Sequence, residues 1–312
     1  MNKQVEVGAW DHSHIYSSLE DHRVEKEISL INSVIEDLKP LGELLKCQLQ
    51  SELVENEELL QTLWKSARLI NKTLTPMSNL QAFALAETSV DSQNKSARQL
   101  QLNLQKLGVN LIKSCNPFNL CMDRISDTLL QKFLEPAEFK NQEFLLRVSR
   151  KFRPFQLPLE QENLLSSMAP SGLRSWQSLY EDLSSKVSVS MDGEDTSVAQ
   201  AMGLLENPES SKRKSAYVGL DKNYHMFRHS YARILTSQVR WRLSEQKQRS
   251  NSSEMHFLDE PLQMGRLTPN TLESMNSLKR MIIPFFRVST DSGSTMPPPV
   301  HRILSRLPFS EA

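Results

Sequence analysis

Apolar residues recur at three- and four-residue steps along most of the chain, which is the spacing of amphipathic helices. The clearest stripe runs from Ala97 to Leu111 and should pack against a partner helix. Because a proline lacks the N–H that bonds to the carbonyl four residues earlier, we expect Pro40 to bend or end the first helix. For the same reason Pro76 and Pro117 should stop the second and third helices. The helices before residue 152 then form hairpins of an up-and-down lobe.

The pattern breaks at two X-Pro pairs between Phe152 and Pro158, which predicts a boundary between two lobes. Beyond it, helices are expected from Leu159 and, after a turn at Gly172, around Trp176. Residues 187–196 are polar and indicate a loop or a short hairpin. A brief helix over residues 201–205 should stop at Asn207-Pro208.

The longest predicted helix runs from about Ser211 to Lys247. It carries an aromatic-rich stripe with steps of three and four residues, which we interpret as core that another element must cover. After residue 288 no helical period remains, so a disordered tail is expected. The stripe consists of Tyr217, Leu220, Tyr224, Phe227, Tyr231 and Ile234.

These elements together predict an all-α fold built from multi-helix lobes of up-and-down hairpins. The chain has only 9 Gly and is rich in Leu, Glu, Gln and Lys, which favours helix over sheet. We expect residues 1–152 to form an N-terminal helical lobe and residues 153–288 a second one. Residues 289–312 form the tail.

The charge balance disfavours binding to nucleic acid or to an anionic membrane, since 37 basic and 37 acidic residues leave no net charge to attract either one. The basic segment 240–249 also carries Glu245 and is interpreted as a solvated helix face. Three cysteines without CxxC spacing do not support structural zinc or a disulfide framework. No run of 18 apolar residues exists, and the first ten residues lack a signal-peptide core. We therefore expect a soluble, cytoplasmic protein.

Few side chains suggest chemistry. His225 and His229 lie one helical turn apart and could share a metal ion, but Met226 stands where a zincin needs Glu. Asp259 and Glu260 are adjacent in a compact turn, where a capping role is favoured over catalysis. His256 could hydrogen-bond a ligand in a groove and is the one candidate substrate-binding residue, although a structural role is the more common one for a histidine in such a position. No catalytic residue and no metal ligand are predicted.

The turn Asp259-Glu260-Pro261 is followed by a helix start. Thr268 is the expected N-cap and Pro269 the first helical residue. Leu272 and Met275 open an apolar face on this last helix.

Read in order, these segments resemble the first half of the oligoendopeptidase F family, zinc metallopeptidases related to thimet oligopeptidase. The resemblance covers about Trp10 to Arg287. It rests on Trp10-Asp11 with residues 15–21, on residues 159–165 with Gly172 and Trp176, on Arg213-Lys214-Ser215-Ala216, on residues 256–262 and on residues 271–275.

The resemblance implies a helical, ellipsoidal fold with a deep groove that admits short peptides. It also implies zinc, held by the two His of a His-Glu-x-x-His motif and a later Glu, with the metal polarising the peptide carbonyl. This sequence contains no such motif. No catalytic or metal residue of the family can therefore be assigned to it.

Two interpretations follow. In the first, the chain is a truncated or frameshifted N-terminal half of a peptidase, inactive alone and binding no zinc, with short peptides as ligands and a separately encoded catalytic half as a possible partner. The composition break after Arg287 motivates this hypothesis. In the second, the chain is a stand-alone helical module that binds peptides or proteins without cleaving them.

Overall fold

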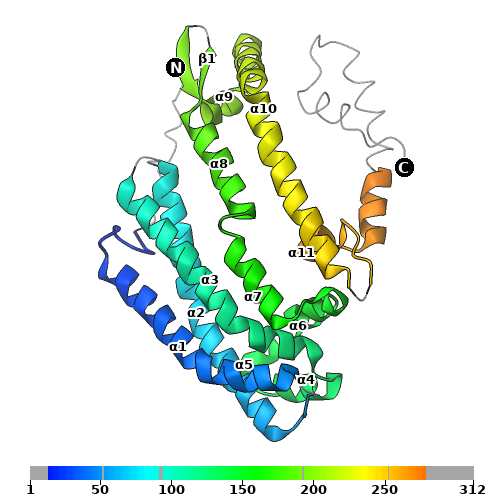
Figure 1. Cartoon of the computed structure of the whole chain (residues 1–312). Helices are drawn as coiled ribbons and strands as arrows, with labels where there is room; N and C mark the ends of the chain where they lie inside the picture. The colour runs from blue at the N-terminus through cyan, green and yellow to red at the C-terminus, as the bar shows by residue number, and fades with distance from the viewer. Residues whose placement is uncertain (1–12, 51–52, 91–93, 192, 252, 279–312) are drawn as a thin grey trace. The chain divides into compact units, whose positions relative to one another are not determined.

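The computed structural model describes residues 13–50, 53–90, 94–191, 193–251 and 253–278 (Figure 1). Within these ranges the regular secondary structure is helical apart from one β-hairpin, and the all-α prediction is confirmed. The chain divides into two compact units, Met1–Met255 and His256–Ala312. Trp10 and the tail predicted from residue 289 lie outside the described residues.

Three long helices build the first part of the larger unit: α1 (His22–Gln50), α2 (Glu57–Val90) and α3 (Lys95–Arg124). Each packs against the other two, as expected for up-and-down hairpins (Figure 1). The stripe predicted on the third helix faces this bundle. The buried residues of this cluster are Tyr16, Val24, Ile31, Ile35, Met77, Leu80, Phe83, Ala84, Leu104 and Leu107, with Leu100 and Leu111 packed against them.

Asp21 caps the start of α1. Its carboxylate accepts hydrogen bonds from the backbone N–H of Ser17 and of Arg23, each at 2.9 Å, and from the Arg23 guanidinium at 2.7 Å. The Arg23 side chain and these backbone donors hold the pKa of Asp21 well below its usual range. Just before it, the Tyr16 ring meets Phe83 edge-on with centroids 5.1 Å apart, which ties the cap to α2.

The three prolines do not end their helices, so the predicted stops at Pro76 and Pro117 are wrong, and α1 also runs through Pro40. The reason is packing on both sides of each proline. Met77 and Leu80 follow Pro76 into the core, and the residues after Pro117 are buried too. Burying one such side chain contributes about 2 kcal/mol, so several of them outweigh the helical hydrogen bond lost at a proline.

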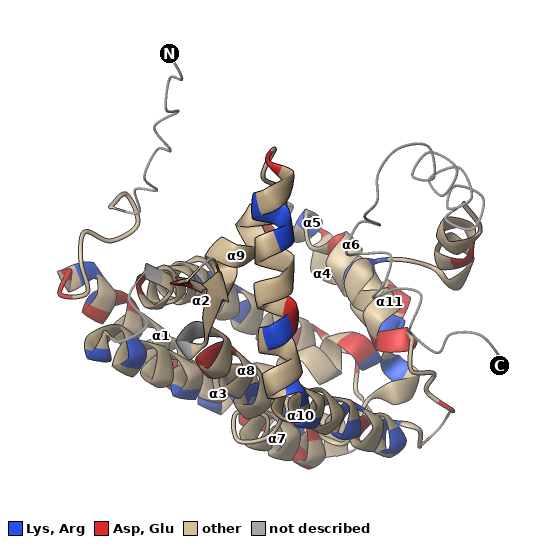
Figure 2. Ribbon diagram, turned by 90° about the horizontal axis from the view of Figure 1, so that it is seen from above, with Lys and Arg blue, Asp and Glu red and all other residues tan. Residues whose placement is uncertain are grey.

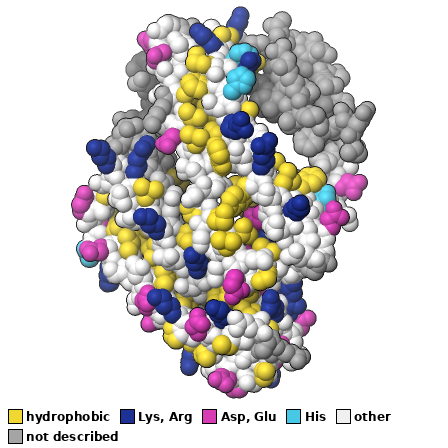
Figure 3. All heavy atoms as spheres, in the orientation of Figure 1, with side chains coloured by type: hydrophobic (Ala, Val, Ile, Leu, Met, Phe, Trp, Pro, Cys, Tyr) yellow, Lys and Arg dark blue, Asp and Glu magenta, His cyan; other side chains and the backbone are white. Residues whose placement is uncertain are grey.

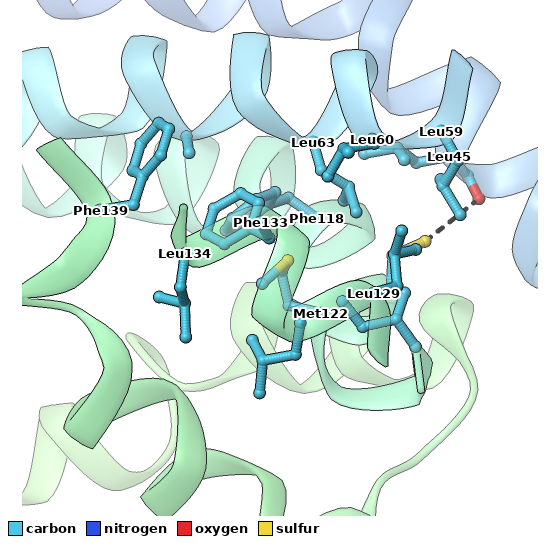
Figure 4. Packing of buried hydrophobic residues seen from close by; sticks show 14 residues of the cluster. Leu45, Leu59, Leu60, Leu63, Phe118, Met122, Leu129, Phe133, Leu134 and Phe139 are labelled. Carbon is cyan, nitrogen blue, oxygen red and sulfur yellow. Dashed lines mark hydrogen bonds between the residues drawn. The ribbon is translucent and has the colours of Figure 1, made fainter. Parts of the chain in front are cut away.

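A second cluster lies where α4 (Asp127–Leu134) and α5 (Ala137–Lys140) pack at the other end of the bundle (Figure 4). The rings of Phe133 and Phe139 stack with centroids 4.8 Å apart, and the indole N–H of Trp64 donates to the Phe133 carbonyl at 2.9 Å. Helix α5 is a single turn of four residues, too short for its apolar spacing to be recognised in the sequence. The buried residues of this cluster include Leu45, Leu59, Leu60, Leu63, Phe118, Met122, Leu129, Phe133, Leu134 and Phe139 (Figure 4).

The segment that follows is built from short elements. Helix α6 (Glu143–Arg150) and the 3-10 helix η1 (Arg153–Phe155) lead to α7 (Leu159–Met168) and α8 (Leu173–Lys186). The X-Pro break predicted at residues 152–158 coincides with η1 and the extended residues after it.

The possible hairpin at residues 187–196 is present: β1 (Ser188–Met191) pairs antiparallel with β2 (Glu194–Ser197). It leads into α9 (Val198–Leu204), which begins with a capping box between Ser197 and Gln200. The predicted helix over residues 201–205 is therefore confirmed.

Helix α10 (Ser210–Arg249) matches the predicted longest helix closely. It packs against α8, α9 and β1. Near its start, Gly219 lies so close to the hairpin that a Cβ there would come within 2.7 Å of Val189 Cγ1. Near its end, Arg249 binds both carboxylate oxygens of Glu162 on α7, at 2.6 and 3.0 Å.

The aromatic stripe of α10 is less covered than predicted. Only Leu220 and Ile234 of the six residues are buried, whereas Tyr224 is 39% exposed. The prediction that another element covers the whole stripe is therefore wrong. Helix α8 reaches the stripe but leaves Tyr224 exposed and Phe227 and Tyr231 only partly buried.

In the second unit, α11 (Asp259–Gly265) begins where a compact turn was expected. Pro261 is tolerated because the first helical N–H groups have no carbonyl partner within the helix. Arg266, in the left-handed conformation at φ 54°, ends α11. Thr268 then caps a further helix: its hydroxyl oxygen accepts the Thr271 N–H at 3.1 Å, and residues 269–278 are helical as predicted.

Charged side chains of both signs are spread over the helices (Figure 2). Among the helices that the structure describes, none has the length and apolar content needed to cross a bilayer.

Candidate functional site

His256, the predicted substrate-binding residue, lies at the start of the second unit and is exposed. Its backbone N–H donates to the Asp259 carboxylate at 2.7 Å, and its Nδ1 accepts the Leu258 N–H at 3.2 Å. Since Nδ1 is an acceptor, the ring proton of the neutral imidazole lies on Nε2. Asp259 thus stabilises the turn, the role that its position in the sequence favoured. The Nε2–H of His256 can donate one hydrogen bond to a ligand.

A shallow hollow of about 300 Å³ lies in the same unit. It is bordered by Leu258 and by one side of the 269–278 helix. Its lining carries a single carboxylate, Glu273, and no cation. The lining residues are Leu258, Pro269, Leu272, Glu273, Asn276 and Ser277.

The larger unit presents a more extended candidate, an aromatic surface between α8 and α10. The Tyr231 ring lies 5.6 Å from Tyr180 of α8, 5.8 Å from Tyr224 and 6.4 Å from Phe227, measured between centroids. In Figure 3 apolar side chains (yellow) form a column over α8 and α10, with Lys and Arg (dark blue) beside it. We call these four aromatic residues the tyrosine surface.

Exposed aliphatic side chains extend the tyrosine surface along α10. Leu235 is 63% exposed, and Val239 and Leu243 are about half exposed. Exposed apolar area of this kind marks binding surfaces more often than scattered single side chains do. The spacing in the sequence singled out Tyr224, Phe227 and Tyr231 but was interpreted as core, because helical spacing does not reveal which stripe lacks a partner; Leu235, Val239 and Leu243 were not predicted.

The candidate pair His225 and His229 lies beside this surface, with Arg228 between the two rings. Arg228 Nη1 lies 3.2 Å from His225 Nε2, and its Nε donates to His229 Nε2 at 3.3 Å. A guanidinium in this position repels a metal cation and occupies the ring nitrogens that would bind it. The pair therefore does not fit a metal ion in this arrangement.

A buried carboxylate, which sequence analysis missed, joins α3 to the segment after it. Asp123 accepts hydrogen bonds from Ser149, at 3.1 Å, and from Gln156. Burial raises the pKa of Asp123 above its ordinary value, while these donors lower it. Arg150 and Arg153 both donate to the Ile125 carbonyl next to it, so the cluster fixes the end of α3.

The cysteines form no disulfide. Burial raises the pKa of Cys115 to about 11 and that of Cys121 to about 12. The Cys121 thiol donates to the Leu45 carbonyl at 3.7 Å (Figure 4), so it packs as a small apolar residue. Neither group is an activated nucleophile.

Residues 123–188 match the sequence profile of the oligopeptidase F family. The predicted resemblance to oligoendopeptidase F is confirmed for this segment, which begins at the Asp123 cluster and runs to the start of β1. A comparison with curated protein sequences finds no match.

The fold is similar to that of oligoendopeptidase F from Enterococcus faecium, with a TM-score of 0.60 at 16% sequence identity. The alignment covers 77% of this chain and 46% of that protein, so the chain spans less than half of its length. A "putative peptidase" from Chlamydophila abortus aligns over 92% of this chain and 48% of its own, with 17% identity and a TM-score of 0.47. The first similarity shows that the helices share the arrangement found in a peptidase of this kind.

The resemblance implies zinc, but the described residues provide no matching set of zinc ligands. In the described ranges, no three His, Cys, Asp or Glu side chains are grouped so that they could hold a metal ion. The pair His225 and His229 offers two imidazoles one helical turn apart, but the Arg228 guanidinium contacts Nε2 of both rings.

Proposed function

We propose that this chain forms part of an oligoendopeptidase F-like zinc metallopeptidase that hydrolyses short peptides. In this proposal the chain supplies one wall of the peptide groove, and the zinc and its ligands belong to sequence outside it. The observation that carries the proposal is the shared fold with oligoendopeptidase F over 77% of the chain. The profile match at residues 123–188 supports the same conclusion independently.

The tyrosine surface is the proposed wall. A groove for peptides of varied sequence needs apolar contacts that tolerate different side chains together with polar groups that orient the backbone. Tyr180, Tyr224 and Tyr231 offer both, since each ring carries a hydroxyl. His256 is proposed as a further peptide contact through its Nε2–H, on the second unit.

The chain alone is proposed to be inactive. None of its seven histidines is followed by Glu, so the His-Glu-x-x-His motif that would activate a zinc-bound water is not in this sequence. A separately encoded catalytic half is the proposed partner, and the cytoplasm the proposed location. The proposed lobes are residues 1–152 and 153–288, with residues 289–312 as a tail.

Hydrolysis and binding by the purified chain test the proposal. An internally quenched peptide of about ten residues is incubated with the chain, with added Zn²⁺ or a chelator, and fluorescence reports cleavage. We expect no cleavage, and saturable binding of the same labelled peptide by anisotropy. Zinc-dependent, chelator-sensitive cleavage would contradict the inactivity, and loss of binding in Tyr224→Ala/Tyr231→Ala would support the assigned wall.

A stand-alone binding module is the second candidate, because the same exposed apolar surface could serve a partner protein. The two candidates differ in what solution measurements show. A fragment whose apolar face normally contacts a missing lobe should self-associate, whereas an evolved module should be monodisperse and unfold cooperatively. Analytical ultracentrifugation and a thermal melt of the purified chain separate these outcomes.

A further inference from the structure

The charge of α10 differs sharply from that of the whole chain. The helix carries ten Lys and Arg against two acidic residues, Asp221 and Glu245, a formal charge of +8, while the complete chain is neutral. Among the described residues, only Lys212 and Arg249 of these ten form ion pairs. Arg213 donates instead to the carbonyls of Asn207 and Pro208, and the remaining cations, which include Arg228 and Arg242, can pair with a ligand of opposite charge.

Two of these cations lie on the side of α10 that carries Tyr224 and Tyr231. Arg228 lies four residues after Tyr224 and three before Tyr231, so it shares their side of the helix. Arg242 lies fourteen residues further on, nearly four whole turns, and so points in a similar direction. Both are exposed.

Leu235 lies midway between the two arginines, seven residues from each, and is 63% exposed. The three side chains thus form a line of cation, apolar group and cation along α10. Arg228 is also held in place, because its guanidinium contacts both His225 and His229. A side chain held in this way loses less conformational entropy when it binds a ligand.

The spacing of the line sets the size of a matching ligand. Fourteen residues of helix rise about 21 Å at 1.5 Å per residue. An extended peptide covers the same distance in about six residues at 3.3 Å each. Carboxylates at positions 1 and 7 of such a peptide would meet the two arginines, and an apolar residue at position 4 would meet Leu235.

We propose that the surface of α10 recognises acidic oligopeptides, with Arg228 and Arg242 binding two carboxylates six residues apart and Leu235 contacting an apolar residue between them. The inference rests on the proposed function, because it names the class of peptide that the groove wall selects. Arg fits this role, since its planar guanidinium pairs with both oxygens of a carboxylate.

An acidic peptide fits this surface better than a nucleic acid does. Nucleic-acid binding depends on many phosphate contacts over a broadly basic surface, whereas the cations of α10 are divided between different sides of the helix and the chain as a whole is neutral. The tyrosine surface and Leu235 instead suit aliphatic and aromatic side chains, which a peptide has between its charges.

Fluorescence anisotropy at low ionic strength tests the inference with three acetylated, amidated heptapeptides. Each has Leu at position 4 and Gly or Ser elsewhere, with Asp, Asn or Lys at positions 1 and 7. The full chain should bind the Asp peptide roughly tenfold more tightly than the Asn peptide, the combined effect expected of two exposed ion pairs. The preference should decline as salt is raised.

Two matched double variants locate the effect. Arg228→Gln/Arg242→Gln should lose the preference for the Asp peptide, whereas Arg233→Gln/Arg240→Gln removes the same charge from another side of α10 and should keep it. Circular dichroism checks that both remain helical.

The remaining outcomes separate this inference from the proposed function. Equal affinity for the Asp and Asn peptides, or equal losses in the two double variants, would overturn the acidic preference while leaving the peptide groove in place. Binding of none of the peptides at millimolar concentration would overturn both. Tighter binding of a single-stranded oligonucleotide than of the Asp peptide would assign the surface to nucleic acid instead.

Discussion

The indole of Trp241 lies directly on Gly172, so closely that a Cβ built on Gly172 would come within 2.2 Å of Trp241 Cζ3. Gly172 begins α8 just after the turn that follows α7, and Trp241 belongs to the last third of α10. The contact therefore joins the α7–α8 junction to α10. It is possible only where the residue under the ring has no side chain.

Gly172→Ala should destabilise the larger unit by about 1–3 kcal/mol, because the indole must move and its packing is lost. Urea unfolding followed by circular dichroism measures this. Gly203→Ala is the matched control, since a Cβ on Gly203 of α9 meets nothing within 4 Å and alanine favours helix. An equal loss in both variants would mean that the Trp241 contact is not the cause.

Glu162→Gln should cost about 1.5 kcal/mol of unfolding free energy. It removes the charge that faces the Arg249 guanidinium, in a pair whose side chains are only 16% and 18% exposed. Arg249 keeps Glu245 at 2.8 Å, which limits the loss. Glu143→Gln, which breaks the exposed pair with Arg147, should change stability by less than about 0.5 kcal/mol.

The Asp21 cap predicts an acid-sensitive part of the stability. Because the folded-state pKa of Asp21 is lowered, its contribution is present above its unfolded pKa near 4 and is lost as pH falls below that value. Asp21→Asn should therefore unfold at a lower temperature than wild type at pH 7. The two melting temperatures should approach each other as the pH falls below about 4, and a constant difference down to pH 2 would rule out this cause.

The cysteines should differ in reactivity. At pH 8 a pKa of about 11 leaves roughly a thousandth of Cys115 as thiolate, and the pKa of about 12 leaves still less of Cys121. Cys47 is exposed. A disulfide reagent should thus modify one thiol quickly and two slowly, and denaturant should expose all three; Cys47→Ser should abolish the fast phase alone.

The sequence predicted the helices from local periodicity, and this succeeded where the pattern was long. The bounds of α10 and the cap at Thr268 depend on nearby residues only; the bounds were predicted to within two residues and the cap at the right residue. The hairpin of β1 and β2 was visible as a polar interruption. These features need no knowledge of what packs against them.

The errors arose where distant contacts decide the structure. The buried residues after Pro76 and Pro117 keep α2 and α3 continuous, and the sequence does not show that α1 lies against both. The aromatic residues of α10 have the same spacing as a core stripe. Only the structure shows that α8 does not cover all of them and that Tyr224 stays exposed. Asp123 could not be singled out, because its donors on Ser149 and Gln156 lie 26 and 33 residues away.

Close contacts fix helix α10 near both of its ends, while the side chains of Arg228, Leu235 and Arg242 between them stay exposed. The hairpin contact at Gly219 fixes one end, and Trp241 with Arg249 fixes the other. These contacts prevent α10 from rotating about its axis and from sliding along it. The side chains between these contacts therefore keep a fixed orientation. A ligand that binds them does not have to restrict a rotation of the helix.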